Sequence, residues 1–472
     1  MIRTMAALHL SVWHIIILLA TVALVIGTGF YVGRSVRSAD SYSLNGRSAG
    51  PWLVAGSIAG TVVGGGSTVG TAQFAFSFGL SAWWFTLGAG LAFCLMGLFY
   101  AKRLRRTNLT TIPQYLSLHY GKRAEEAAGI ISSVGILFSA VASCIPGIEI
   151  IAALFRISAW QAALVLILLV AGYTFFGGMK SAGVGGILKM AIIWVSLAIA
   201  GGSAAYSLWS LPTLGVSFPA SAFNLFGQGG STALANLLAL IVGIFCTQTY
   251  IQAVFSASKP AVASLGCFVA ALIVIPVGLP SVSIGMYMYY FAPQSLPVLV
   301  LPLYLTEHQP VLVAGVALGG IMLSLIGSIG GLSLGIGTMV SHDILSPLLG
   351  IREDKKLLRL TRASVLGVMV VACGIAIVNQ DTEVLFWNYL SMGLRGGGIF
   401  LPLTLAVFWP GHVKALWVVL SMLGSTVAAM LASTVIPLPF DPLFAGLLVS
   451  LALLVPGLRW QKQPLLVQER RE

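Results

Sequence analysis

The sequence predicts an all-α integral membrane protein with about 13 transmembrane helices, and three observations lead to this prediction. Hydrophobic residues make up 58% of the 472-residue chain and charged residues only 8%, too few to cover a water-soluble fold. Apolar stretches of membrane-spanning length follow one another along the chain. Of the 25 Lys and Arg residues, all but four lie in gaps on one predicted side, the exceptions being Arg3, Arg156, Lys189 and Arg395. This asymmetry predicts a multi-pass protein of the plasma or inner membrane, with its N-terminus outside and its C-terminus in the cytoplasm.

A helix needs about 20 residues to cross the hydrocarbon core, and this length defines the predicted spans. They lie near residues 12–31, 52–77, 80–101, 127–154, 158–176, 184–206, 232–253, 263–291, 311–338, 361–379, 385–408, 412–434 and 441–456. The gaps between them are short, so we expect residues 1–472 to form a single membrane domain in contact with lipid.

Composition argues against several other classes of protein. The net charge of +12 is spread over loops beside the spans, so it does not indicate a nucleic-acid partner. The five cysteines fall in apolar stretches without close pairing, which favours core residues over a disulfide framework or metal site. No HExxH motif occurs and only His14 approaches a span, so an intramembrane hydrolase is not expected. Neither an enzyme, a cofactor nor an obligatory protein partner is indicated.

The second span contains the most informative stretch, because glycines and hydroxyl residues gather in the middle of a crossing at residues 59–67. Each glycine weakens a helix interior by up to about 1 kcal/mol relative to alanine. The cluster therefore predicts a broken helix, whose freed carbonyls can bind a cation where they line a buried cavity. The alternative is close helix packing through small residues.

The ninth span is also hydroxylic at mid-depth. Ser324 and Ser328 are four residues apart and share a helix face. A hydroxyl there could supply an oxygen to a cation, or it could bond back to its own helix.

Four stretches together resemble the sodium:solute symporter family. They are Asn45–Trp52, Gly177–Lys180, Thr247–Lys259 and Ser341–Leu345. The resemblance implies two inverted five-helix repeats, the LeuT-like fold, here at 52–206 and 232–408. An extra N-terminal helix would lie in 1–40, two C-terminal helices in 412–456 and a cytoplasmic tail in 457–472.

The resemblance also implies a sodium site between the first and eighth core helices. Its ligands would be main-chain carbonyls of Gly60, Val63 and Ser324, and the side-chain positions 327 and 328. Two residues depart from the family pattern. Gly327 offers no hydroxyl where Ser328 does. The family's Thr-Asp-x-x-Gln after its Gly-Gly turn reads Gly185–Lys189 here, so the carboxylate is missing and the amine of Lys189 lies one turn away.

Lys189, Glu149 and Arg395 are the charged residues predicted well inside spans, each costing about 2.5–3.5 kcal/mol on insertion scales. Lys189 could snorkel to the cytoplasmic side, pair with Glu149, or carry a proton with its ammonium in place of sodium. Arg395 could clamp a substrate carboxylate or staple two helices together. Glu149 could meet a substrate amine or neutralise Arg395.

Four further polar residues are substrate-binding candidates because of their places in the family pattern: Thr61, Thr247, Gln248 and Tyr250. The resemblance thus implies a secondary active transporter that couples a small polar organic solute, such as an amino acid or carboxylate, to a sodium gradient by alternating access. Proton-coupled or sodium-independent transport through Lys189 is the alternative.

Overall fold

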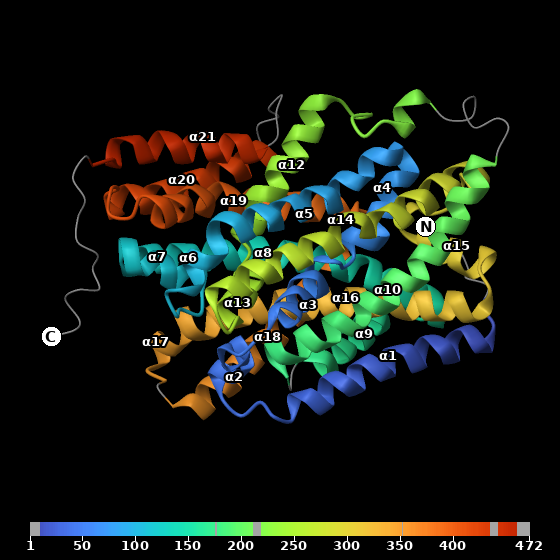
Figure 1. Cartoon of the computed structure of the whole chain (residues 1–472), viewed down its shortest axis with the longest axis horizontal. Helices are drawn as coiled ribbons and strands as arrows, with labels where there is room; N and C mark the ends of the chain where they lie inside the picture. The colour runs from blue at the N-terminus through green and yellow to red at the C-terminus, as the bar shows by residue number, and fades with distance from the viewer. Residues whose placement is uncertain (1–9, 175–176, 211–218, 352, 435–441, 460–472) are drawn as a thin grey trace.

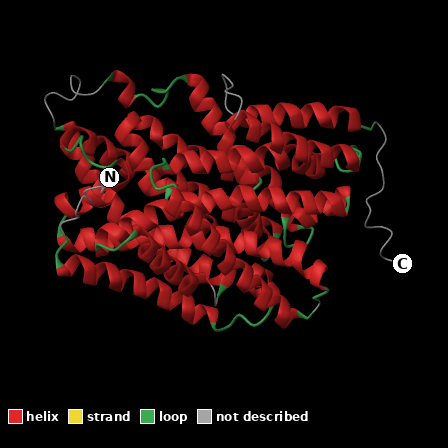
Figure 2. Cartoon of the chain, turned by 180° about the vertical axis from the view of Figure 1, so that it is seen from behind, coloured by secondary structure: helices red, strands yellow, loops and turns green. Residues whose placement is uncertain are grey.

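The computed structural model describes residues 10–174, 177–210, 219–351, 353–434 and 442–459, and within these ranges it is built from helices and short connections (Figure 2). The first half contains α1 Val12–Gly33, α2 Ala39–Leu44, α3 Pro51–Val62, α4 Thr71–Phe78, α5 Trp84–Leu95, α6 Ala101–Arg105, α7 Ile112–Tyr120, α8 Lys122–Phe155, α9 Ala159–Thr174 and α10 Gly178–Trp209. The second half contains α12 Gly230–Phe245, α13 Gln248–Ser256, α14 Pro260–Phe291, α15 Val300–His308, α16 Val311–Met339, α17 Ser346–Leu349, α18 Asp354–Val378, α19 Val384–Phe408, α20 Ala415–Thr434 and α21 Pro442–Leu454.

The all-α membrane architecture is confirmed, whereas the number of spans is not. Within the described residues, nine helices are long and apolar enough to cross a membrane, or up to ten if one bent pair counts as a single span. Three shorter apolar helices accompany them, at Pro51–Val62, Ala159–Thr174 and Pro442–Gly457. The break after Val62 leaves Pro51–Val62 short, whereas Ala159–Thr174 and Pro442–Gly457 are short helices that border residues outside the described ranges. Residues 1–9 and most of the predicted tail, from 460 onward, lie outside the described residues.

The long helices run side by side along one direction (Figure 1). α3, α10 and α16 pack against one another in the interior, and α8 packs against both α16 and α19. Helices α6, α7, α13 and α17 lie together at one end of the bundle, at the left of Figure 1. We call this the basic end, because α6 carries three of the predicted cytoplasmic cations, Lys102, Arg103 and Arg105.

The predicted break in the second span is confirmed at Val63–Gly65. Helix α3 ends at Val62, Val63 has φ −79° and ψ 79°, and a π-helical turn begins at Gly66. The N–H of Gly64 donates to Val62 O at 2.9 Å instead of continuing the helix. A Cβ at Gly65 would lie 3.1 Å from the Cα of Ser143 on α8, so close approach of the neighbouring helices also requires glycine here.

A second break separates α12 from α13, and the two helices are bent by 50°. Cys246 and Thr247 leave the helical conformation, with ψ values of 8° and 111°. Both breaks lie deep in the protein, where loose backbone survives only if other groups satisfy its carbonyls and N–H groups.

Candidate functional site

Side chains of α16 bond the carbonyls that the α3 break leaves free. The Oγ of Ser324 donates to Val63 O at 2.6 Å, and the Oγ of Ser328 donates to Thr61 O at 2.7 Å. The Oγ of Ser143 on α8 donates to Ser328 Oγ at 3.3 Å. The hydroxyls of the ninth span therefore bond across to the broken helix, and not back to their own helix as one alternative expected.

Lys189 reaches the same carbonyls from α10. Its Nζ donates to Val63 O at 3.1 Å and to Ser324 O at 3.2 Å, and the residue is 0% exposed. The snorkelling alternative is therefore wrong, because the ammonium points into the protein and not toward its basic end. Among the described residues, no ion pair joins Lys189 to Glu149 or to any other carboxylate, so main-chain oxygens alone bond the amine.

Gly60 and Gly327 border the ammonium on opposite helices. A Cβ built at Gly327 would lie 2.8 Å from Lys189 Nζ and 3.2 Å from Gly60 O. The structure thus brings four of the positions expected to hold a coupling ion, Gly60, Val63, Ser324 and Gly327, to one side-chain amine, while the fifth, Ser328, bonds Thr61 O of the same broken helix. Whether they bind an ion stays a prediction.

Three of the substrate-binding candidates, Thr61, Thr247 and Tyr250, contact other protein groups in this structure. The Oγ1 of Thr247 donates to Gly243 O at 2.7 Å, and the Oγ1 of Thr61 on α3 donates back to Ser57 O at 2.9 Å. The ring of Tyr250 is buried edge-on against Phe93, with 5.2 Å between centroids. Both threonine hydroxyls bond the carbonyl four residues earlier in the chain, and neither bond joins two helices.

The side-chain amide of Gln248 forms hydrogen bonds with main-chain groups at the basic end. Its Oε1 accepts the N–H of Ile112 at 2.8 Å, and its Nε2 donates to Thr110 O at 3.0 Å. Nearby, Gln114 Nε2 donates to a carboxylate oxygen of Asp343 at 2.9 Å. Gln248 therefore ties α13 to the start of α7, and both ends of its amide are already used in this conformation.

Arg395 joins three helices. Its Nε donates to Gly243 O on α12 at 3.1 Å, and its Nη1 donates to Ser391 Oγ on α19 at 2.5 Å and to Ser139 Oγ on α8 at 3.3 Å. The guanidinium is 1% exposed, and no described carboxylate forms an ion pair with it. The staple reading is supported by these contacts, yet the positive charge has no negative partner in the described residues.

Glu149 lies apart from both cations. It is partly exposed in α8, three residues after the helix-interior Pro146, and it forms no ion pair with Lys189 or Arg395 in the described residues. The expectation that Glu149 neutralises Arg395 is therefore wrong for this conformation.

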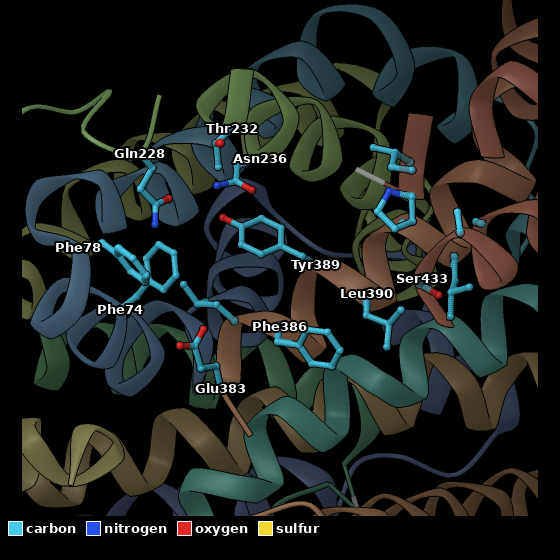
Figure 3. A pocket seen from close by; sticks show the side chains of 17 residues that line it. Phe74, Phe78, Gln228, Thr232, Asn236, Glu383, Phe386, Tyr389, Leu390 and Ser433 are labelled. Carbon is cyan, nitrogen blue, oxygen red and sulfur yellow. The ribbon is translucent and has the colours of Figure 1, made fainter. Parts of the chain in front are cut away.

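Figure 3 shows the side chains that line a cavity of about 440 Å³. The cavity lies between α4, α12, α19, α20 and α21. It therefore adjoins one half of each broken span: α4, which follows the α3 break, and α12, which precedes the α12–α13 break. Most of its lining is aromatic or aliphatic, and its polar members are Gln228, Thr232, Asn236, Glu383, Tyr389 and Ser433.

Sequence reasoning missed two serines of α8 that contact the predicted site residues. Ser139 and Ser143 face Arg395 and Ser328 respectively, and their spacing of four residues places them on one face of α8. That pattern was a usable signal. The contact between Cys144 and Cys373, whose Sγ atoms lie 3.6 Å apart, had no sequence signal because 229 residues separate them. Both thiols are free, and the described residues contain no group of three or more His, Cys, Asp or Glu that could hold a metal ion.

The chain is similar to known proteins in sequence and in fold. The model of the sodium:solute symporter family matches residues 42–420. The human high affinity choline transporter 1 is 24% identical over 80% of this chain and 68% of its own length. A sodium/proline symporter of Staphylococcus aureus is 24% identical over 85% of this chain and 83% of its own length. A solved Na⁺-coupled sialic acid symporter in a substrate-bound outward-open state superposes with a TM-score of 0.81 at 16% identity, covering 95% of this chain and 97% of the other.

Proposed function

Because the chain belongs to the sodium:solute symporter family, we propose that it imports a small polar organic solute together with a cation by alternating access. The family consists of membrane transporters and not enzymes, and it supports sodium as the coupling ion. The LeuT-like fold agrees with this assignment. The solute, the direction of transport, the repeats at 52–206 and 232–408 and the orientation with a cytoplasmic basic end are parts of the proposal.

The break in α3 is the observation that carries the coupling proposal. It turns the carbonyls of Thr61 and Val63 toward α16, where Ser328 and Ser324 meet them. Discontinuous helices with unwound carbonyls build the cation sites of transporters of this architecture. A site between two helices that move apart would link cation binding to the conformational cycle.

The unpaired charge of Arg395 supports a solute that carries a carboxylate. A buried guanidinium costs free energy unless a negative group compensates it, and the described residues provide none. Its hydrogen bonds to described residues use Nε and Nη1, which leaves Nη2 for a further acceptor. A solute carboxylate would supply both the acceptor and the charge. A solute with a net positive charge, such as the choline named for one relative, fits this surrounding less well than an amino acid or monocarboxylate.

The two breaks provide the moving parts. Gln248 closes the basic end by bonding the start of α7, while the 440 Å³ cavity adjoins α4 and α12, one half of each broken span. We infer that a solute approaches from the cavity side and that release requires the Gln248 bonds to open.

Uptake into proteoliposomes tests the proposal. The full chain is reconstituted, and radiolabelled L-proline, lactate and choline are supplied outside under an inward sodium gradient, an inward proton gradient, or neither. Concentrative uptake of proline or lactate that requires a gradient supports cation-coupled transport of a carboxylate solute. Uptake of choline alone would overturn the carboxylate assignment, and equilibration without accumulation would overturn active transport. The proton arm addresses the alternative in which Lys189 carries the coupling proton.

A further inference from the structure

The two departures from the family's cation site touch each other. Gly327 lacks the hydroxyl that the family places there, and Lys189 stands where the pattern has no amine. A Cβ at position 327 would lie 2.8 Å from Lys189 Nζ, closer than real Cβ atoms come to their neighbours. The two changes, 138 positions apart in sequence, therefore form one replacement: glycine provides the space that the ammonium fills.

The ammonium lies on the oxygens that would otherwise hold the ion. Val63 O and Ser324 O accept its hydrogen bonds at 3.1 and 3.2 Å, and Gly60 O borders the same space from the opposite helix. An ammonium offers three donors and one positive charge, so it satisfies a ring of carbonyl oxygens as a bound cation does. With no carboxylate paired to Lys189 among the described residues, a second cation at these oxygens would meet uncompensated like charge.

Close packing of α10 against α3 fixes the position of the Lys189 amine. A Cβ at Gly60 of α3 would lie 2.8 Å from the Cα of Gly186, and a Cβ at Gly186 would overlap the carbonyl of Gly56. The helices therefore touch backbone to backbone one turn before Lys189, which fixes the reach of its side chain to the α3 break.

We propose that the Lys189 side chain is the resident cation of the α3–α16 site and that sodium does not bind there. This inference rests on the proposed transport function and revises its coupling step. The α3 break still links a cation to the conformational cycle, but that cation is the Lys189 ammonium, and any cotransported sodium must bind in another part of the molecule. The inference depends on occupancy of the site by the amine and requires no titration of Lys189.

Sodium binding by the purified full-length protein tests the proposal directly. ²²Na⁺ is the probe, in detergent solution with potassium as the competing control ion. The wild type is expected to show no saturable binding that Ser328→Ala removes. The double variant Lys189→Ala/Gly327→Ser empties the space and restores the hydroxyl, so it should bind ²²Na⁺ at least about tenfold more tightly than the wild type, and Ser328→Ala should abolish that gain.

Each result has a consequence. Wild-type binding that Ser328→Ala abolishes would overturn the proposal, as would a folded double variant that gains no binding. Wild-type binding that is unchanged by Ser328→Ala lies elsewhere and agrees with the proposal.

A stability measurement keeps the test decisive if the double variant folds poorly. Gly327→Ser should lower the melting temperature of the wild type, because the new Cβ displaces the flexible end of Lys189 from its carbonyl partners, and should cost less in a Lys189→Ala background. Equal losses in both backgrounds would mean that the two residues do not share one space, which would overturn the proposal. Neither measurement uses a transported solute, so a failure here is distinguishable from a failure of the uptake experiment.

Discussion

Lys189 and Arg395 are both buried cations inside the membrane domain, but different kinds of atoms surround them. Lys189 bonds only main-chain carbonyls, and glycines shape the space around it. Arg395 bonds two serine hydroxyls and one carbonyl, and it joins three helices. The Lys189 site should therefore respond to the size of residues near it, whereas the Arg395 cluster should respond to loss of charge or hydroxyl groups.

The roles that we propose for the two charges also differ. Both carbonyls that accept hydrogen bonds from Lys189, those of Val63 and Ser324, lie at positions expected for the coupling ion, which is why we propose its amine as the resident cation. Arg395 is held firmly yet keeps a donor and a full charge without a described carboxylate, as a substrate-binding group requires.

The largest expected effect comes from removing the charge of Arg395. Arg395→Met should raise the KM for the best-transported carboxylate of the uptake panel by about 10- to 100-fold, since a hydrogen bond to a charged group contributes about 1.5–3 kcal/mol. The measurement is initial uptake rate against solute concentration in proteoliposomes. Arg395→Lys is the matched control. It keeps the charge but not the planar guanidinium, so its KM should lie between those of the wild type and Arg395→Met. If Arg395→Met kept the wild-type KM, Arg395 would not bind the solute and would serve only to join the three helices.

A change in helix packing should follow in size. Gly186→Ala places a methyl group against the carbonyl of Gly56 and should destabilise the protein by about 1–3 kcal/mol through overpacking. Thermal unfolding in detergent would show this as a lower melting temperature. Gly202→Ala lies on the same helix, where a Cβ meets nothing within 4 Å, and should leave the melting temperature unchanged or slightly higher. Equal melting temperatures for the two variants would contradict the backbone contact.

The two cation sites also differ in how far the sequence predicted them. The glycine run of the second span predicted a break, and the structure confirms it at Val63–Gly65, because repeated glycine is a local signal. The contact of Lys189 with Gly327 depends on how α10 meets α16, and nothing local encodes it. Sequence reasoning therefore identified both departures but treated them as unrelated.

The Arg395 cluster shows the same limit. A mid-span arginine marks a functional or stapling site from composition alone. Its partners Ser139 and Gly243 come from two other helices, and small residues are so common in this chain that none stands out. Gln248 was predicted near a solute because of its family position, whereas the structure shows its amide bonded to the main chain before α7.

Opening the basic end should have an intermediate effect. Gln248→Leu removes two hydrogen bonds and leaves the buried N–H of Ile112 without its acceptor, a local cost of about 1–3 kcal/mol. Hydrogen–deuterium exchange should speed up in residues 110–116. Gln309→Leu is the control, because Gln309 bonds Tyr304 of α15, and α15 lies at the other end of the molecule from α7 in Figure 1. Unchanged exchange in Gln248→Leu would show that these bonds do not hold the end closed.

The smallest expected effect tests whether hydroxyl groups support Arg395. Ser139→Ala removes the weaker of the two hydroxyl partners of Nη1, 3.3 Å away, while Ser391 remains. The loss should be about 0.5–1.5 kcal/mol, which raises the KM for the carboxylate solute by about 2- to 12-fold. Ser132→Ala is the matched control on the same helix, because the Oγ of Ser132 is buried without a hydrogen-bond partner among the described residues. Its removal should leave the KM unchanged. If both serine variants behaved alike, the Ser139 hydroxyl of α8 would not position the guanidinium. The partners of Arg395 would then no longer distinguish it from the carbonyl-bound Lys189.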